Sequence, residues 1–158
     1  MKRLLVVLGV LVLALIVSSA VLAQSSQGDP RVGTWTLNVA KSKGNTRKSE
    51  TRTYTQSGGT VTAHVELVDS DGTKVAYGFN ATADGKDYPF TGQPPGGGDS
   101  VSIRRIGNAF VGEDKKGGKV LLTTRTTFSA DGKVMTLTAK GTYANGQPIN
   151  AVRFYDKQ

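Results

Sequence analysis

Apolar and polar residues alternate with a period of two through most of the chain after its first 23 residues. Within 60–67 the apolar residues occupy every second position, and Val75, Tyr77, Phe79 and Ala81 repeat the pattern. No part of this region shows the i, i+3, i+4, i+7 apolar spacing of an amphipathic helix. A period of two places the apolar side chains on one face of a strand, so we expect an all-β fold.

Turn signals interrupt this alternation about every ten residues. Asp-Gly and Asn-Gly steps occur at 71–72, 84–85, 131–132 and 145–146. These dipeptides readily adopt the positive φ angles of tight hairpins. We therefore predict ten consecutive strands, near 32–38, 50–56, 60–68, 74–82, 86–91, 100–106, 109–114, 119–128, 133–143 and 149–156.

A sheet of about ten strands is not expected to remain open. It would expose two long edges with unpaired backbone groups, which natural proteins avoid. Closure removes both edges, so residues 32–158 are expected to form a single antiparallel up-and-down β-barrel of about 8–10 strands. The loop at 92–99, Gly-Gln-Pro-Pro-Gly-Gly-Gly-Asp, has no strand pattern, and it could be a lid or a tether.

The first 23 residues have the organisation of a secretory signal peptide. Lys2 and Arg3 precede an unbroken run without polar side chains from 4 to 17, and the stretch ends in Val21-Leu22-Ala23. This pattern predicts cleavage and export to the periplasm or the extracellular space. The run is also long enough to remain as a membrane anchor. Residues 24–31 are expected to be a flexible segment before the barrel.

Charge and cysteine content narrow the possible partners. The chain has no cysteine, which excludes disulfides, thiol catalysis and cysteine metal sites. Without Lys2 and Arg3, 18 basic residues face 12 acidic ones, a net charge of +6. This balance favours anionic partners such as lipids or envelope polymers. The basic residues form pairs such as Arg47-Lys48 and no long run, so nucleic acid is not an expected partner.

Residues for catalysis or metal binding are sparse. His64 is the single histidine, and its alternation places it on the polar face of its strand beside Glu66. One histidine without cysteine cannot supply an ordinary zinc site, and no G-x-S-x-G motif accompanies it. We therefore predict a protein that is not an enzyme, with no cofactor, no metal and no catalytic residues.

The first predicted strand begins with Gly33-Thr34-Trp35. A G-x-W start to an up-and-down barrel resembles the signature of the calycins, which include lipocalins and fatty-acid-binding proteins. The resemblance implies that Gly33 and Trp35 close one end of the barrel. It also implies that a basic side chain from the last strand lies across the Trp35 ring, and Arg153 is the natural candidate. The longer string GTWTLNVAKSK looks like uncharacterised exported bacterial proteins described as lipocalin-like.

The end of the chain carries a second resemblance. Arg153-Phe154-Tyr155 is similar to the closing strand of fatty-acid-binding proteins, in which an Arg-x-Tyr pair points inward and holds a ligand carboxylate. Carried over, Arg153 and Tyr155 would form that anchor, unless Arg153 instead caps Trp35. Those proteins have a helix-turn-helix lid between their first two strands. Here only 39–49 connects the corresponding strands, with room for one helical turn at 40–43.

Two functions remain open from the sequence. The first is an exported lipocalin-like protein, a monomer, that binds a small apolar or amphipathic molecule such as an acidic lipid. Its interior aromatic residues Tyr77, Phe79 and Phe110 would contact the ligand. The alternative is an envelope interaction module with a filled barrel, whose basic surface binds anionic polymers or membrane.

Overall fold

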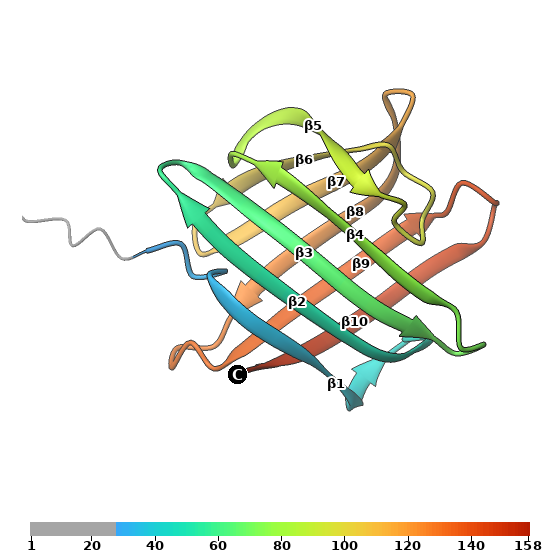
Figure 1. The fold of residues 1–158 in the computed structure, drawn as a ribbon, viewed down its shortest axis with the longest axis horizontal. Helices are drawn as coiled ribbons and strands as arrows, with labels where there is room; N and C mark the ends of the chain where they lie inside the picture. The colour runs from blue at the N-terminus through green and yellow to red at the C-terminus, as the bar shows by residue number, and fades with distance from the viewer. Residues whose placement is uncertain (1–27) are drawn as a thin grey trace, which may run out of the picture.

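Ten antiparallel strands follow one another along the chain and close into a barrel in the computed structural model, which describes residues 28–158 (Figure 1). Each strand pairs with its neighbours in sequence, and β1 pairs with β10 to close the sheet. The strands are β1 (Gly33–Lys43), β2 (Arg47–Ser57), β3 (Thr60–Asp69), β4 (Lys74–Ala81), β5 (Asp84–Gly92), β6 (Ser100–Ile106), β7 (Ala109–Lys116), β8 (Lys119–Phe128), β9 (Val134–Thr142) and β10 (Pro148–Lys157).

The predicted all-β barrel is confirmed, with a strand at each of the ten predicted places. Closure satisfies the edge groups that an open sheet would expose. The predicted signal peptide, its cleavage and residues 24–27 lie outside the described residues. Within 28–158, no helix is long and apolar enough to cross a membrane.

The connection between β1 and β2 is shorter than predicted. Both strands extend into 39–49 and leave only residues 44–46 between them, so strand occupies 40–43, where the sequence left room for one helical turn. A bulge lies between Asn38 and Lys43 in the β1–β10 ladder. There the Ser42 hydroxyl donates to the Asn38 carbonyl oxygen at 2.7 Å and accepts from the Phe154 N–H at 3.1 Å. These side-chain bonds replace ladder bonds at the bulge, and the sequence near Ser42 gives no sign of them.

Trp35 lies at the end of the barrel where β1 begins. The G-x-W resemblance implies that it closes this end, and this role stays a prediction. Its side chain is fully buried, and its Nε1–H donates to the Arg31 carbonyl oxygen at 2.7 Å. Its ring centroid lies 5.5 Å from that of Phe128. The cation over the ring is Lys157, whose Nζ lies 5.1 Å from the centroid, so the prediction that Arg153 caps Trp35 is wrong. Lys157 is the residue directly opposite Trp35 in the β1–β10 register, whereas Arg153 lies further along β10.

Gly33 makes room for this arrangement. Its φ is +127°, and a Cβ at this position would lie 2.9 Å from Cε of Lys157. A larger residue would therefore be strained and would also push against the side chain that covers Trp35. Gly33 thus leaves space for Lys157, the side chain that lies over the Trp35 ring.

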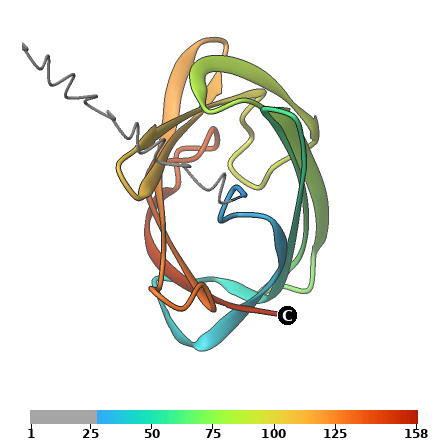
Figure 2. The same ribbon diagram turned by 90° about the vertical axis from the view of Figure 1, so that its left-hand side faces the viewer.

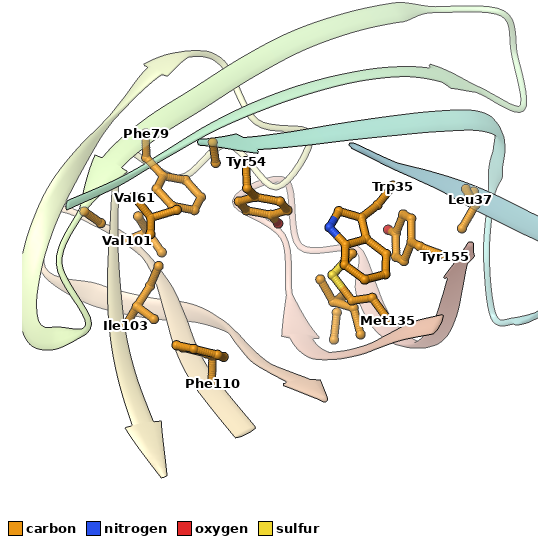
Figure 3. Packing of buried hydrophobic residues seen from close by; sticks show 14 residues of the cluster. Trp35, Leu37, Tyr54, Val61, Phe79, Val101, Ile103, Phe110, Met135 and Tyr155 are labelled. Atoms are coloured by element: carbon orange, nitrogen blue, oxygen red, sulfur yellow. The ribbon is translucent and has the colours of Figure 1, made fainter. Parts of the chain in front are cut away.

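The apolar side chains inside the barrel form one cluster, most of which Figure 3 shows. Trp35, Met135 and Tyr155 have no exposed surface and lie close together in it. Phe110 joins them through Phe128, whose ring centroid lies 5.5 Å from that of Trp35 and 6.4 Å from that of Phe110. The side chains come from strands on opposite walls, so the cluster ties the walls together.

Candidate ligand-binding cavity

A cavity of about 90 Å³ lies inside the barrel, so the interior is not completely filled. Part of its wall is apolar and is formed by Phe79, Phe90, Val101, Ile103, Phe110 and Leu137. The other part is polar and charged and is formed by Arg47, Arg52, Tyr54, Tyr77, Asp114 and Arg153. A wall that combines apolar and charged groups suits an amphipathic molecule.

The segment before β1 covers one end of the cavity. Arg31 is 4% exposed, lines the cavity and places its guanidinium 4.0 Å from the centroid of the Phe110 ring. Its guanidinium also donates to both carboxylate oxygens of Asp29, at 2.9 and 2.7 Å. Arg31, at the end of the described part of the predicted flexible segment (28–31), is therefore packed against the barrel, and the end-on view shows the backbone before β1 lying within the outline of the barrel (Figure 2).

The loop at 93–99 covers part of the cavity as well. Pro94 and Gly96 are buried, and both line the cavity. The Gly96 carbonyl oxygen accepts from the Ala144 N–H at 2.9 Å, and the Asp99 N–H donates to the Lys115 carbonyl oxygen at 2.8 Å. These bonds hold the loop to the β9–β10 connection and to β7, so it folds over the barrel instead of extending from it as a tether.

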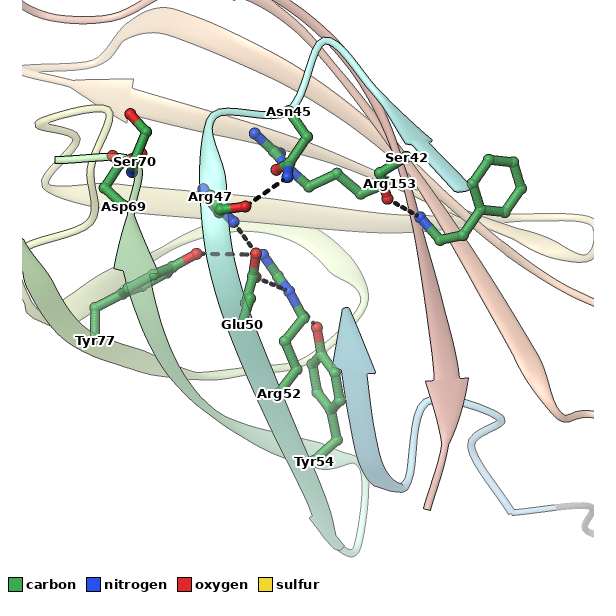
Figure 4. Close-up of polar contacts among 11 residues, drawn as sticks. Ser42, Asn45, Arg47, Glu50, Arg52, Tyr54, Asp69, Ser70, Tyr77 and Arg153 are labelled. Atoms are coloured by element: carbon green, nitrogen blue, oxygen red, sulfur yellow. Dashed lines mark hydrogen bonds and ion pairs between the residues drawn. The ribbon is translucent and has the colours of Figure 1, made fainter. Parts of the chain in front are cut away.

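A buried ion cluster forms the centre of the polar wall (Figure 4). The Glu50 carboxylate accepts from Arg47 and from Arg52, and its side chain has no exposed surface. Burial favours the neutral acid, but Arg52, Arg47 and Arg153 outweigh it and lower the pKa of Glu50 to about 2. Arg52 also donates to the hydroxyl oxygens of Tyr54 and Tyr77, at 3.2 and 3.3 Å. Glu50 thus fixes two guanidinium groups at the cavity wall.

Arg153 and Tyr155 both lie inward from β10, and each has a polar atom without a partner among the described residues. Arg153 is 2% exposed, and its Nε donates to Asn45 Oδ1 at 3.2 Å, but its Nη2 makes no hydrogen bond. The Tyr155 hydroxyl is likewise buried without a partner. Burial raises the pKa of Tyr155, so this phenol remains a donor at neutral pH. Buried polar atoms almost always have partners. Arg153 lines the cavity, so its free Nη2 marks a place for another molecule there, whereas Tyr155 is not among the residues that line the cavity.

The other predicted ligand contacts are distributed over the cavity wall. Tyr77, Phe79 and Phe110 all line the cavity, with Phe79 and Phe110 less than 10% exposed. Tyr77 belongs to the charged side, because its hydroxyl accepts from Arg52. Phe79 and Phe110 belong to the apolar side. Whether these residues touch a ligand stays a prediction.

Sequence reasoning missed Arg47, Glu50 and Arg52. Both faces of β2 are polar, since threonines alternate with the charged residues, so hydropathy alone does not identify the inward face. The neighbouring strand β3 could have identified the inward face of β2. The tight turn at 58–59 pairs Ser57 with Thr60, and the same register places Arg52 opposite Val65, which is on the apolar face of β3.

The sequence also suggested that the positive charge lies on the surface, which is wrong in part. Four arginines are buried, Arg31, Arg47, Arg52 and Arg153, whereas Glu50 is the single fully buried acid of the described residues. Burial concentrates part of the charge inside the barrel, where each unit of charge acts more strongly than at the surface.

His64 lies on the surface of the barrel. Its side chain is 60% exposed, as predicted, and its ring nitrogen lies 3.3 Å from Glu66. Among residues 28–158 there is no group of three or more histidines and acids that could hold a metal ion. The cavity wall itself presents guanidinium, phenol and aromatic groups.

Comparison with solved structures finds a similar barrel. The ileal bile acid-binding protein of zebrafish, crystallised in complex with cholic acid, superposes with a TM-score of 0.54 at 13% sequence identity. The match covers 82% of this chain and 100% of that one. No family model and no curated protein matches the sequence. At this identity the likeness concerns the fold alone, which is a closed, ten-stranded antiparallel barrel in this chain.

Proposed function

We propose that this protein binds a small amphipathic acid inside its barrel, with the carboxylate of the ligand held by Arg153 and Tyr155. The observation that carries the proposal is the buried, unpartnered donor at Arg153 Nη2 on the cavity wall. The Tyr155 hydroxyl, two residues along the same strand, is a second unpartnered donor, and a carboxylate has two oxygens that can accept from such donors. The similar barrel was crystallised with cholic acid, an amphipathic molecule, which agrees with this class of ligand.

The charge balance of the wall favours an anion. Glu50 is shared between Arg47 and Arg52, so one carboxylate faces two guanidinium groups. Arg153 adds a third guanidinium, whose side-chain partner is the neutral amide of Asn45. Asp114 is a second acid on the wall, so three guanidinium groups face two carboxylates and an excess of one positive charge remains. In a site of low dielectric constant, a ligand carboxylate gains much more from this excess positive charge than it would at the surface.

The size of the cavity limits the ligand. Pockets for drug-sized molecules have volumes of roughly 300–1,000 Å³, whereas this cavity measures about 90 Å³. We therefore favour a short- or medium-chain acid over a molecule as large as a bile acid. Its chain would lie against Phe79 and Phe110 on the apolar side of the wall.

The sequence adds the compartment to this proposal. The leader of residues 1–23 supports export, so the protein would meet its ligand in the periplasm or outside the cell. Binding as a monomer is sufficient, because one barrel contains the whole cavity.

Calorimetric titration with octanoate and with 1-octanol tests this proposal, because the two molecules differ in the charged group. We expect octanoate to bind and octanol to bind more weakly. Replacement of a buried charged hydrogen bond costs about 1.5–3 kcal/mol, so Arg153→Gln should weaken octanoate binding by about 10- to 150-fold. The matched control is Arg125→Gln, which changes an exposed arginine of β8.

Two results would contradict the proposal. One is the failure of octanoate and other short acids to bind the wild-type protein. The other is an equal loss of octanoate and octanol binding in the Arg153→Gln variant, which would show that Arg153 acts through the fold and not on the carboxylate.

A further inference from the structure

A second acid lies on the cavity wall in an unusual setting. Asp114, on β7, lines the cavity and is only partly buried. Its neighbours across the sheet are Val101 on β6 and Leu122 on β8, both less than 10% exposed. Apolar residues thus flank this carboxyl on both sides. Within 28–158 its side chain makes no recorded hydrogen bond or ion pair, so Asp114 differs from Glu50.

The charged groups that face Asp114 come from other strands. Arg47 and Arg52 of β2 act on it electrostatically, and it acts in turn on the Tyr77 phenol of β4. Arg153 of β10 and Tyr143, which follows β9, line the same cavity.

The neighbouring elements add no other titratable group to this part of the wall. β6 and β8 contribute apolar and threonine side chains, and the covering loop contributes Pro94, Pro95 and Gly96. Lys115, the next residue on β7, forms ion pairs with Asp87 and Glu113.

Burial dominates the protonation of Asp114. It raises the pKa of this carboxyl to about 6, although Arg52 and Arg47 oppose the shift. Near neutral pH the carboxyl is therefore mostly ionised, but a modest further rise in its pKa would protonate it. A second negative charge inside the same small cavity causes such a rise, because like charges in a shared site raise each other's pKa.

We propose that Asp114 takes up one proton from solvent when an anionic ligand enters the cavity, so that this residue makes ligand affinity depend on pH. The inference rests on the proposed function and adds a specificity-determining residue to the same site. With Asp114 ionised, the ligand anion meets a competing anion for Arg47 and Arg52. With Asp114 protonated, the same guanidinium groups act on the ligand alone.

Linkage fixes the sign and the size of the effect. Affinity should be nearly constant below about pH 6, where Asp114 is already protonated in the free protein. Above that pH each bound ligand requires up to one proton, so affinity falls by at most about tenfold per pH unit. Release is thus favoured at higher pH and uptake at lower pH.

The test uses 1-octanesulfonate, which stays anionic over the whole range, so that titration of the ligand does not contribute. Calorimetry at pH 5.5, 6.5 and 7.5 compares the wild type with Asp114→Asn and with Asp87→Asn, an exposed control on β5. We expect wild-type affinity to fall by about three- to tenfold from pH 6.5 to 7.5. The Asp114→Asn variant should show no such fall and should bind more tightly than the wild type at pH 7.5.

A second measurement does not depend on any variant. Titration of the wild type at pH 7.5 in two buffers with different ionisation enthalpies gives the number of protons taken up, which should approach one. Binding without proton uptake, or an unchanged pH dependence in Asp114→Asn, overturns this inference and leaves the proposed function in place. Failure of the wild type to bind the probe at every pH overturns both.

Discussion

The Tyr155 hydroxyl gives the sharpest stability prediction, because it is buried without a partner among the described residues. A buried hydroxyl in this state costs about 1–3 kcal/mol of folding free energy. Tyr155→Phe removes that cost and keeps the ring, over which the Arg52 guanidinium lies at 5.4 Å. We therefore expect the variant without ligand to be more stable by about 1 kcal/mol, or about 4 °C in Tm. The same change should weaken octanoate binding several-fold, since one of the two donors is lost.

Tyr54→Phe is the matched control. Tyr54 is also buried, but its hydroxyl accepts a hydrogen bond from Arg52 at 3.2 Å. Removal of this hydroxyl should lower stability by about 1 kcal/mol. Urea unfolding and thermal melting of both variants without ligand measure the contrast. If Tyr155→Phe loses as much stability as Tyr54→Phe, the Tyr155 hydroxyl already has a partner, and the reasoning that assigns it to a ligand is refuted.

The ion cluster and the β1–β2 turn give further predictions. Glu50→Gln leaves two buried guanidinium groups without their carboxylate, so urea unfolding at neutral pH should show a loss of about 3–5 kcal/mol. The pKa of Glu50 is lowered to about 2, so the contribution of its ionised carboxylate to folding stability is complete above about pH 4.5 and is lost as the pH falls toward 2. Melting curves across this pH range should therefore show a smaller fall in Tm for Glu50→Gln than for the wild type. Gly44→Ala would place a Cβ 2.2 Å from a backbone oxygen of β10, whereas a Cβ at Gly58 meets nothing within 4 Å. Both have positive φ, so Gly58→Ala should cost about 1 kcal/mol and Gly44→Ala clearly more, and equal melting temperatures for the two would contradict the crowding at Gly44.

The barrel could be predicted because its signals are local. Alternation in β3, as in Val61, Ala63, Val65 and Leu67, identifies an inward face without knowledge of any other strand. Asp-Gly and Asn-Gly turns then separate the strands. The bulge at Asn38 in β1 could not be found in this way, because its hydrogen bonds come from a side chain and from a strand more than 100 residues away.

The candidate site was harder to predict, because its charged residues do not follow the hydropathy rule. Arg153 and Tyr155 were found through the ending of the chain, which resembles a known motif. Glu50 and Arg52 have no such local signal, and a buried charge is unfavourable unless its partners are also inside. Those partners come together only when the strands are paired, so the register of β2 against β3 carries the missing information.

The residue that lies over Trp35 also could not be predicted without the strand register. A basic residue over Trp35 was predicted from the resemblance, but β10 offers more than one candidate. The register decides between them, because Lys157 is the Cα partner of Trp35.

The central claim is that the cavity holds a small amphipathic acid. Native mass spectrometry tests this claim most directly. The protein is produced as the full chain in a host that exports proteins, its mass is measured, and the purified sample is then extracted with solvent. We predict a second mass that corresponds to one small acid per chain, either after purification or after incubation with a mixture of short- and medium-chain acids. A bare protein mass that persists after this incubation, in a sample that melts cooperatively, would contradict the claim.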